Sequence, residues 1–404
     1  MRHFSHLPET EVTRLFHRLP VSVDRYGDPQ LLAVALGATL YSPATRPTLA
    51  SDIAWHTARG VTSLVVDLED ALADEHVEAG ERNAAEQLRR YHATGNDAPM
   101  LFIRVREPAQ IGRLLTRLGT AATVLTGFVV PKFSAANGEE YITAVAEASA
   151  ASGVRLLAMP VLESPDMIYR ESRKDALVAA ARVLNKHREH VLALRLGATD
   201  LCSAYGLRRP RDMPIYDLHL VAEVIADIVN VFGRVDGTGF TITGPVWEYF
   251  SKSERMFKPQ LRESPFVEHH ARAFRQQLIA DGLDGLIREV ILDQANGLTG
   301  KTVIHPTHVA AVNALSVVGH EDFCDASDIL GHELAGGVRA SRYANKMNEM
   351  KPHEAWARRV TARAAAFGVA AEGVTFVDLL EASVSASDRV RDHLESSDSR
   401  EGVA

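Results

Sequence analysis

The chain has 404 residues and a formal net charge of −8 at pH 7, with no block rich in Lys or Arg. It therefore lacks the basic footprint of a protein that binds nucleic acid or an anionic membrane. The two cysteines, Cys202 and Cys324, are too few for a disulfide framework. No run approaches the roughly 20 apolar residues of a membrane span, and no apolar signal core opens the chain. We expect a soluble, cytoplasmic protein.

Residues 1–36 precede the first predicted strand, and the pattern of Glu9–Arg18 indicates an N-terminal helical extension. Between residues 37 and 306, short apolar runs alternate with helix-length segments, which is typical of parallel strands covered on both faces. The predicted strands are Leu40–Pro43, Ser63–Asp70, Leu101–Val105, Gly127–Lys132, Leu156–Glu163, Ala193–Asp200, Gly239–Thr243 and Thr302–His305.

Eight such strands predict an α/β fold, a (β/α)8 TIM barrel over residues 37–306. Because the chain exceeds the roughly 250 residues of a bare barrel, further elements are expected. A helical pattern predicts a helical C-terminal region over residues 307–395, followed by a flexible tail over 396–404. The C-terminal ends of barrel strands meet at one mouth, where such barrels perform their chemistry. We therefore expect Lys132, a candidate catalytic residue, to share one pocket with the other charged strand-end residues, which are Glu69, Asp70, Arg104, Glu163, Asp200 and His305.

One connection, from Thr243 to Lys301, is much longer than a loop plus one helix. It contains several aromatic residues and two predicted helical stretches, Phe266–Leu278 and Leu286–Gln294. An insertion beside the mouth can be a lid that determines specificity, or a helix pair packed on the side of the barrel. The sequence leaves both interpretations open.

Two carboxylates, Glu163 and Asp200, close successive predicted strands. Together they would form a hard, anionic oxygen site, which suits Mg²⁺ because this ion takes one or two protein carboxylates and leaves its other positions to water and substrate. The alternative is that each side chain caps the helix that follows it.

A second charged group is predicted from two neighbouring strands. Arg104 ends its strand and can hold a substrate carboxylate or stabilise a developing enolate oxygen. Asp67, Glu69 and Asp70 cluster at another strand end, and close like charges raise one another's pKa, which prepares a general acid or base. The alternative is scaffolding, in which these acids form ion pairs with Arg104 and Lys132.

His305 ends the last predicted strand as a polar group at the mouth, or else as a packed, hydrogen-bonded histidine. Zinc is not expected at His305 and His308, because no third ligand has the right spacing. The segment 295–302 fits a permissive phosphate-loop pattern, but a strand follows it and Pro306 would interrupt a helix. We therefore expect no bound nucleotide or other organic cofactor.

Seven short motifs follow one another along the chain: Leu40–Pro43, Val66–Ala71, Ile103–Val105, Val130–Lys132, Leu162–Ser164, Gly197–Leu201 and Gly300–Pro306. Their order resembles that of the HpcH/HpaI aldolase and citrate lyase superfamily. Over roughly residues 37–320 the chain resembles the citrate lyase beta-subunit-like proteins. Its length and altered C-terminus resemble a divergent branch of carbon–carbon bond lyases associated with tellurite-resistance-type operons.

The resemblance implies a barrel of the phosphoenolpyruvate/pyruvate-binding class that assembles as a homo-oligomer, a trimer or hexamer. It also implies a divalent metal at Glu163 and Asp200, Mg²⁺ or alternatively Mn²⁺, with Arg104 near the reacting oxygens. The turn at Ser42–Pro47 lacks the basic, glycine-containing motif that the family associates with thioesters, and its glycine-rich C-terminal lid is not recognisable. The free acid and its CoA thioester are therefore both candidate substrates.

The predicted function is that of a Mg²⁺-dependent lyase or aldolase that acts on a small oxo- or hydroxy-acid through a metal-stabilised enolate. An acid of the Asp67–Asp70 cluster, or His305, would move the proton, and the sequence does not decide between them. Two alternatives remain at this stage. One is a metal-dependent hydrolase or phosphoryl-transfer enzyme on a related acid, and the other is a non-catalytic barrel subunit of a biosynthetic complex.

Overall fold

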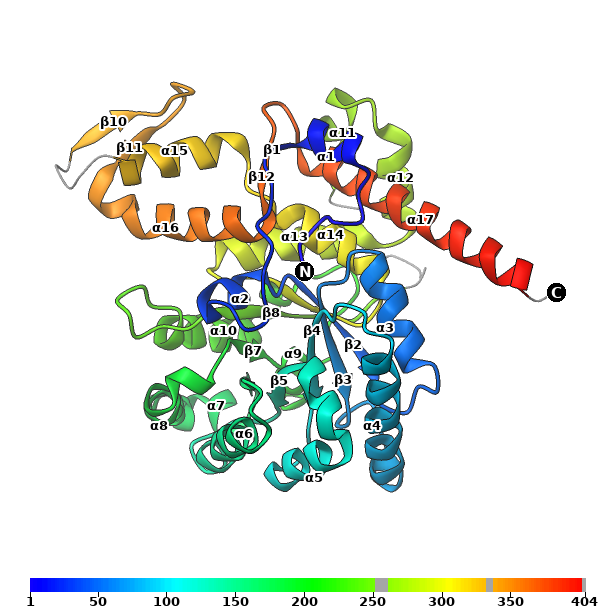
Figure 1. Ribbon diagram of the computed structural model, residues 1–404. Helices are drawn as coiled ribbons and strands as arrows, with labels where there is room; N and C mark the ends of the chain where they lie inside the picture. The colour runs from blue at the N-terminus through cyan, green and yellow to red at the C-terminus, as the bar shows by residue number, and fades with distance from the viewer. Residues whose placement is uncertain (251–260, 332–336, 402–404) are drawn as a thin grey trace.

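A closed barrel of eight parallel strands forms the centre of the computed structural model, which describes residues 1–250, 261–331 and 337–401 (Figure 1). Each strand pairs with the next along the chain, and the last pairs with the first. The TIM-barrel prediction is therefore confirmed. The strands are β2 (Ala38–Pro43), β3 (Ser63–Asp67), β4 (Met100–Arg104), β5 (Leu125–Val130), β6 (Leu157–Leu162), β7 (Leu194–Leu196), β8 (Ile242–Trp247) and β9 (Lys301–Val303).

Strand residues are buried on both faces, as the near-continuous apolar runs predict. Every residue of β5 and of β6 is buried. All eight strands differ from their predicted bounds, six of them by one to three residues at an end and β7 and β8 by up to four. β8 begins three residues later than expected, and β7 ends at Leu196 because a helix begins directly after Gly197. As a result Asp200 lies in the first turn of that helix rather than on the strand.

Helices connect the strands and surround the barrel, as Figure 1 shows. The connecting α-helices are α3 (Leu49–Ala58), α4 (Val77–Ala93), α5 (Pro108–Leu118), α6 (Gly138–Ser152), α7 (Pro165–Ile168), α8 (Arg170–Lys186), α9 (Ala198–Ser203), α10 (His219–Phe232), α11 (Ser264–Glu268), α12 (Arg272–Ala280) and α13 (Leu283–Ala295). Short 3₁₀ segments are η1 (Asp74–His76), η2 (Gly119–Val124), η3 (Arg188–His190) and η4 (Ile215–Asp217).

The described part of the long connection after β8 consists of α11, α12 and α13, and α12 packs on α13. This arrangement resembles the predicted helix pair. The remaining stretch, residues 251–260, lies outside the described residues. The lid interpretation of the connection stays a prediction.

The two terminal regions meet beside the barrel. The N-terminal region contains α1 (Glu9–Leu15), β1 (Phe16–Arg18) and α2 (Pro29–Ala35). The C-terminal region contains α14 (Thr307–Ser316), α15 (His320–Gly331), β10 (Val338–Ala340), β11 (Met347–Glu349), α16 (Met350–Phe367), β12 (Val369–Ala370) and α17 (Phe376–Glu401). β1 pairs antiparallel with β12 and so joins the two regions. β10 and β11 form a separate hairpin.

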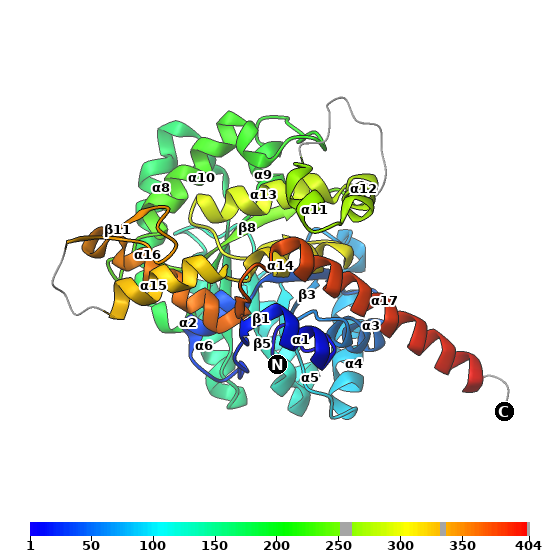
Figure 2. The same ribbon diagram turned by 90° about the horizontal axis from the view of Figure 1, so that it is seen from above.

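The helical prediction for both terminal regions thus misses four strands of two or three residues. α15 and α16 share a small apolar core of their own, apart from the main core. α17 extends away from the barrel and continues as a helix through residues 396–401 of the expected tail (Figure 2). Residues 402–404 lie outside the described residues.

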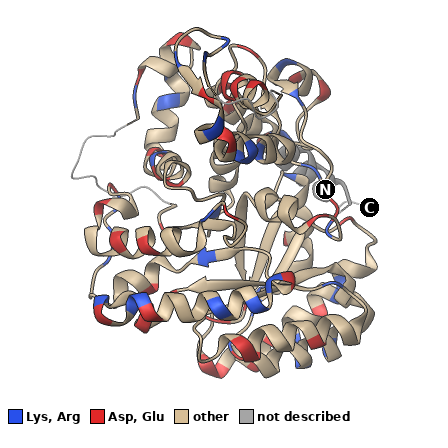
Figure 3. Ribbon diagram, turned by 90° about the vertical axis from the view of Figure 1, so that its left-hand side faces the viewer, with Lys and Arg blue, Asp and Glu red and all other residues tan. Residues whose placement is uncertain are grey.

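The surface charge is mixed, and acidic and basic residues are interspersed along the outer helices (Figure 3). Among the described residues, no helix is both long and apolar enough to cross a membrane.

Candidate active site

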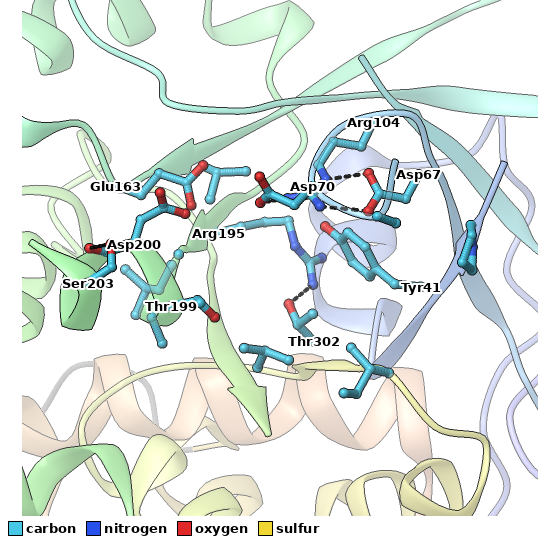
Figure 4. A pocket seen from close by; sticks show the side chains of 18 of the residues that line it. Tyr41, Asp67, Asp70, Arg104, Glu163, Arg195, Thr199, Asp200, Ser203 and Thr302 are labelled. Atoms are coloured by element: carbon cyan, nitrogen blue, oxygen red, sulfur yellow. Dashed lines mark hydrogen bonds and ion pairs between the residues drawn. The ribbon is translucent and has the colours of Figure 1, made fainter. Parts of the chain in front are cut away.

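A cavity of about 480 Å³ lies at the C-terminal ends of the barrel strands, where the fold predicts a site (Figure 4). Five of the eight predicted site residues line it: Asp67, Asp70, Arg104, Glu163 and Asp200. The rest of its polar lining comes from Tyr41, Ser42, Arg195, Thr199, Ser203 and Thr302.

Glu163 and Asp200 lie beside each other on one wall of this cavity (Figure 4). Glu163 follows the last residue of β6 and is buried, and its Oε1 accepts a hydrogen bond of 3.0 Å from the backbone N–H of Lys132. Its other oxygen lies against Gly197, where an added Cβ would be 1.6 Å from Oε2. The absence of a side chain at residue 197 therefore makes room for the carboxylate.

The two carboxylates are not helix caps. The residues at the N-cap positions of α7 and α9 are Ser164 and Gly197. Burial raises the pKa of Glu163 to about 8, and the neighbouring negative charge of Asp200 contributes to the rise. A buried acid next to a second acid is a place where a cation would be stabilised.

The donor set fits Mg²⁺. Within the part of the chain that the structure describes, no group of three or more His, Cys, Asp or Glu side chains is arranged to enclose a metal. Two carboxylates that face an open cavity match an ion that keeps most of its positions for water and substrate. Glu163 and Asp200 are accordingly the residues that could hold it.

Arg104 is held by three carboxylates. Its Nε and Nη2 donate to the two oxygens of Asp67 at 2.7 and 2.6 Å, and Nη1 lies 3.0 Å from Glu69 and 3.2 Å from Asp70. Burial lowers the pKa of Arg104, but the contact with Asp67 outweighs burial and the pKa is raised. The ion pairs considered from the sequence therefore exist, and Arg104 lines the cavity at the same time.

Asp67, Glu69 and Asp70 reach the same arginine although strand alternation predicts opposite faces for Asp67 and Asp70. β3 ends at Asp67, and the chain then turns, with the N–H of Glu69 donating to Asp67 Oδ1 at 2.9 Å. Burial raises the pKa of Glu69. Burial would also raise the pKa of Asp70. The hydrogen bond with Glu69 and the charges of Arg104 and Lys132 outweigh burial, so the pKa of Asp70 is lowered.

Lys132 lies between the cluster Asp67–Asp70 and the pair Glu163 and Asp200. Its Nζ lies 2.5 Å from Glu69 Oε1 and 3.8 Å from Asp200 Oδ1. The backbone has φ +48°, a conformation that non-glycine residues rarely adopt and that concentrates at functional sites. Burial lowers the pKa of Lys132, but the pair with Glu69 outweighs it and the pKa is raised. Glu69 and Lys132 thus support the cavity wall rather than form it.

His305 is not among the residues that line this cavity. Its ring stacks on Phe250 with the ring centroids 5.0 Å apart, Nδ1 is 2.7 Å from the hydroxyl of Thr307, and burial lowers its pKa. This is the packed, hydrogen-bonded arrangement, and a catalytic role for His305 stays a prediction. Lys301 of the phosphate-loop-like segment is fully buried and pairs with Glu289 and Asp293.

Sequence reasoning missed Arg195, which lies within β7 and lines the cavity. The signal was available, because a charged residue inside an apolar strand run needs a reason to be buried. Tyr41 and Thr302, which also line the cavity, carry no comparable signal.

One family model and one solved structure agree with this architecture, and a further structure is similar to part of it. A family model described as a C–C bond lyase of the TIM-barrel fold matches residues 30–369. A citrate lyase structure from Burkholderia xenovorans is 16% identical with a TM-score of 0.58, and covers 85% of this chain and 96% of its own. CitE from Mycobacterium tuberculosis, in complex with magnesium, acetoacetate and coenzyme A, is 21% identical with a TM-score of 0.49. The match covers 82% of this chain and 99% of the CitE chain. No curated protein sequence matches the chain.

Proposed function

Because the chain belongs to the family of C–C bond lyases of the TIM-barrel fold, we propose that this carbon–carbon lyase acts on a small oxo- or hydroxy-acid, with Mg²⁺ held by Glu163 and Asp200. The observation that carries the proposal is the pair of carboxylates on one cavity wall, where burial and Asp200 raise the pKa of Glu163 to about 8. Mn²⁺ is the alternative ion, since it also takes oxygen ligands.

A bound divalent ion would supply Lewis-acid charge to the carboxylate and the neighbouring oxygen of the substrate. The protein sets the ligand positions in advance. Glu163 is fixed by the N–H of Lys132 and by the space at Gly197, and Lys132 Nζ stands 3.8 Å from Asp200. Such preorganisation reduces the rearrangement needed when the substrate arrives.

In the cleavage direction, a base accepts the hydroxyl proton of the substrate, the C–C bond breaks, and its electron pair becomes the enolate of the departing fragment. Arg104 would stabilise the enolate oxygen, because its guanidinium lines the cavity and is held in place by Asp67, Glu69 and Asp70. A protonated group then returns the proton to carbon, so that the reaction is balanced without net addition of water.

Asp70 is our candidate for the base. Its side chain is 55% exposed and lines the cavity, so a substrate hydroxyl can reach it. Asp67 is bound through both oxygens to Arg104, and Glu69 is held between Arg104 and Lys132. We therefore assign Asp67 and Glu69 a positioning role.

Product analysis tests the proposed function. Hydroxy-acids and hydroxy-oxo-acids, each as free acid and as CoA thioester, are incubated with the protein and Mg²⁺ and followed by proton NMR. Two fragments whose carbons add up to the substrate, formed only with metal and not by Asp200→Asn, support a lyase. Products that keep the carbon chain and gain water would indicate a hydrolase and contradict the proposal.

A further inference from the structure

Three cationic side chains surround the cavity, and their partners differ. Arg104 contacts three carboxylates, and Lys132 lies 2.5 Å from Glu69. Arg195 has no carboxylate within 4.0 Å in the described part of the chain; it contacts only neutral groups. It is therefore the one cation at this mouth whose charge is not compensated by the described residues.

The neutral contacts of Arg195 hold it without neutralising it. Its Nη2 donates to the hydroxyl of Thr302, Nη1 lies 4.0 Å from the sulfur of Met159, and Cζ is 5.5 Å from the ring centre of Tyr41. The residue is only 1% exposed. Burying a cation without a counter-ion costs several kcal/mol, and a hydrophobic side chain of similar volume would serve the barrel interior better.

The position of Arg195 suits a ligand between the charged groups. It extends from β7 through the middle of the cavity, with Glu163 and Asp200 on one side and Tyr41 on the other (Figure 4). A guanidinium forms two parallel hydrogen bonds with a carboxylate, and Thr302 fixes the orientation of this one.

We propose that Arg195 binds a second carboxylate of the substrate and makes this lyase specific for dicarboxylic oxo- or hydroxy-acids. The proposal rests on the proposed function, in which the first carboxylate lies beside Glu163 and Asp200. A monocarboxylic acid of the same length leaves the buried guanidinium uncompensated, so it binds more weakly.

Two pairs of acids matched in chain length test this inference by calorimetry: malate against 2-hydroxybutyrate, and 2-oxoglutarate against 2-oxopentanoate. For the wild-type protein in Mg²⁺ we expect the dicarboxylate of at least one pair to bind on the order of 10²-fold more tightly. Arg195→Met abolishes this preference and leaves the affinity for the monocarboxylate and for Mg²⁺ itself unchanged. Arg195→Lys keeps the positive charge but cannot form two parallel hydrogen bonds with a carboxylate, so it retains only part of the preference for the dicarboxylate.

A preference that survives Arg195→Met, or equal or undetectable binding of both members of both pairs by the wild-type protein, overturns the inference. Thermal unfolding of the ligand-free variant is the second readout. Removal of an unpaired buried charge leaves the melting temperature of Arg195→Met unchanged or higher, whereas a clear decrease shows that the arginine has a structural role. If that variant does not fold, an unchanged preference in Arg195→Lys overturns the inference.

The two proposals can fail separately. Mg²⁺ titration without any acid tests the metal site, and the matched pairs are also measured without Mg²⁺. If the wild-type protein does not bind Mg²⁺ but still prefers the dicarboxylate, the result contradicts the proposed function and supports the role of Arg195.

Discussion

Gly197 controls the position of Glu163. An alanine there would place Cβ 1.6 Å from Glu163 Oε2, and the buried carboxylate would have to move. We expect Gly197→Ala to weaken Mg²⁺ binding at least tenfold, measured by calorimetry, because the displaced oxygen no longer faces Asp200. Gly112→Ala is the matched control, since no atom lies within 4 Å of its added Cβ. Unchanged Mg²⁺ affinity in Gly197→Ala would contradict this geometry.

The pH dependence of metal binding follows from the raised pKa of Glu163. Mg²⁺ needs the ionised carboxylate, so below a pKa of about 8 a proton competes with the metal. Affinity should rise by up to tenfold per pH unit between pH 6 and 8 and level off above pH 8. Glu163→Gln should remove most of this dependence. A wild-type affinity that does not change from pH 6 to 9 would count against the assignment.

We expect Asp70 to accept a proton from the substrate and not to take part in metal binding. Asp70→Asn should lower kcat by about 10²- to 10⁴-fold, the usual contribution of a general base. Its Mg²⁺ affinity should stay within about twofold of wild type, because Asp70 contacts Arg104 and Lys132 rather than Glu163. Asp74→Asn, at an exposed position of η1 outside the cavity, is the control. A variant with normal kcat would exclude Asp70 as the base.

Most of the charged residues at the cavity could be predicted because each follows an apolar strand run in the sequence. The contacts between these charged residues could not be predicted. The turn after Asp67 brings Asp70 to Arg104, and the positive φ of Lys132 directs its N–H to Glu163. Both depend on local backbone geometry, to which strand alternation gives no access.

At the scale of elements, the strands were predictable because parallel barrel strands are buried on both faces and read as apolar runs. The residues at which the strands end were harder to predict. β7 has only three residues because α9 begins after Gly197, and four further strands of two or three residues are too short to show any periodicity. Their pairing depends on contacts between distant segments.

A buried ion network joins α13 to β9. Lys301 is fully buried, and its Nζ lies 2.8 Å from Glu289 and 2.7 Å from Asp293. Lys301→Met leaves two acids without this cation, so we expect the free energy of unfolding to fall by about 3–5 kcal/mol in urea titrations. Lys351→Met, at an exposed position of α16, should change it by less than about 0.5 kcal/mol. A loss below about 1 kcal/mol for Lys301→Met would contradict the importance of this network.

For the whole molecule, the alternation of strands and helices was sufficient to predict the barrel, since each unit repeats the same local pattern. The arrangement of the terminal regions was not predictable in this way. β1 and β12 lie about 350 residues apart in sequence and pair through only two registered positions. The separate core of α15 and α16 likewise gives no signal that distinguishes it from the main core.

The central claim is that the barrel brings Glu163 and Asp200 to one cation. Calorimetric titration of Mg²⁺ into wild type, Glu163→Gln and Asp200→Asn tests it most directly, with circular dichroism to verify folding. We predict one Mg²⁺ per chain in the wild type and a loss of at least tenfold in affinity in each variant. Wild-type affinity in either correctly folded variant would contradict the claim.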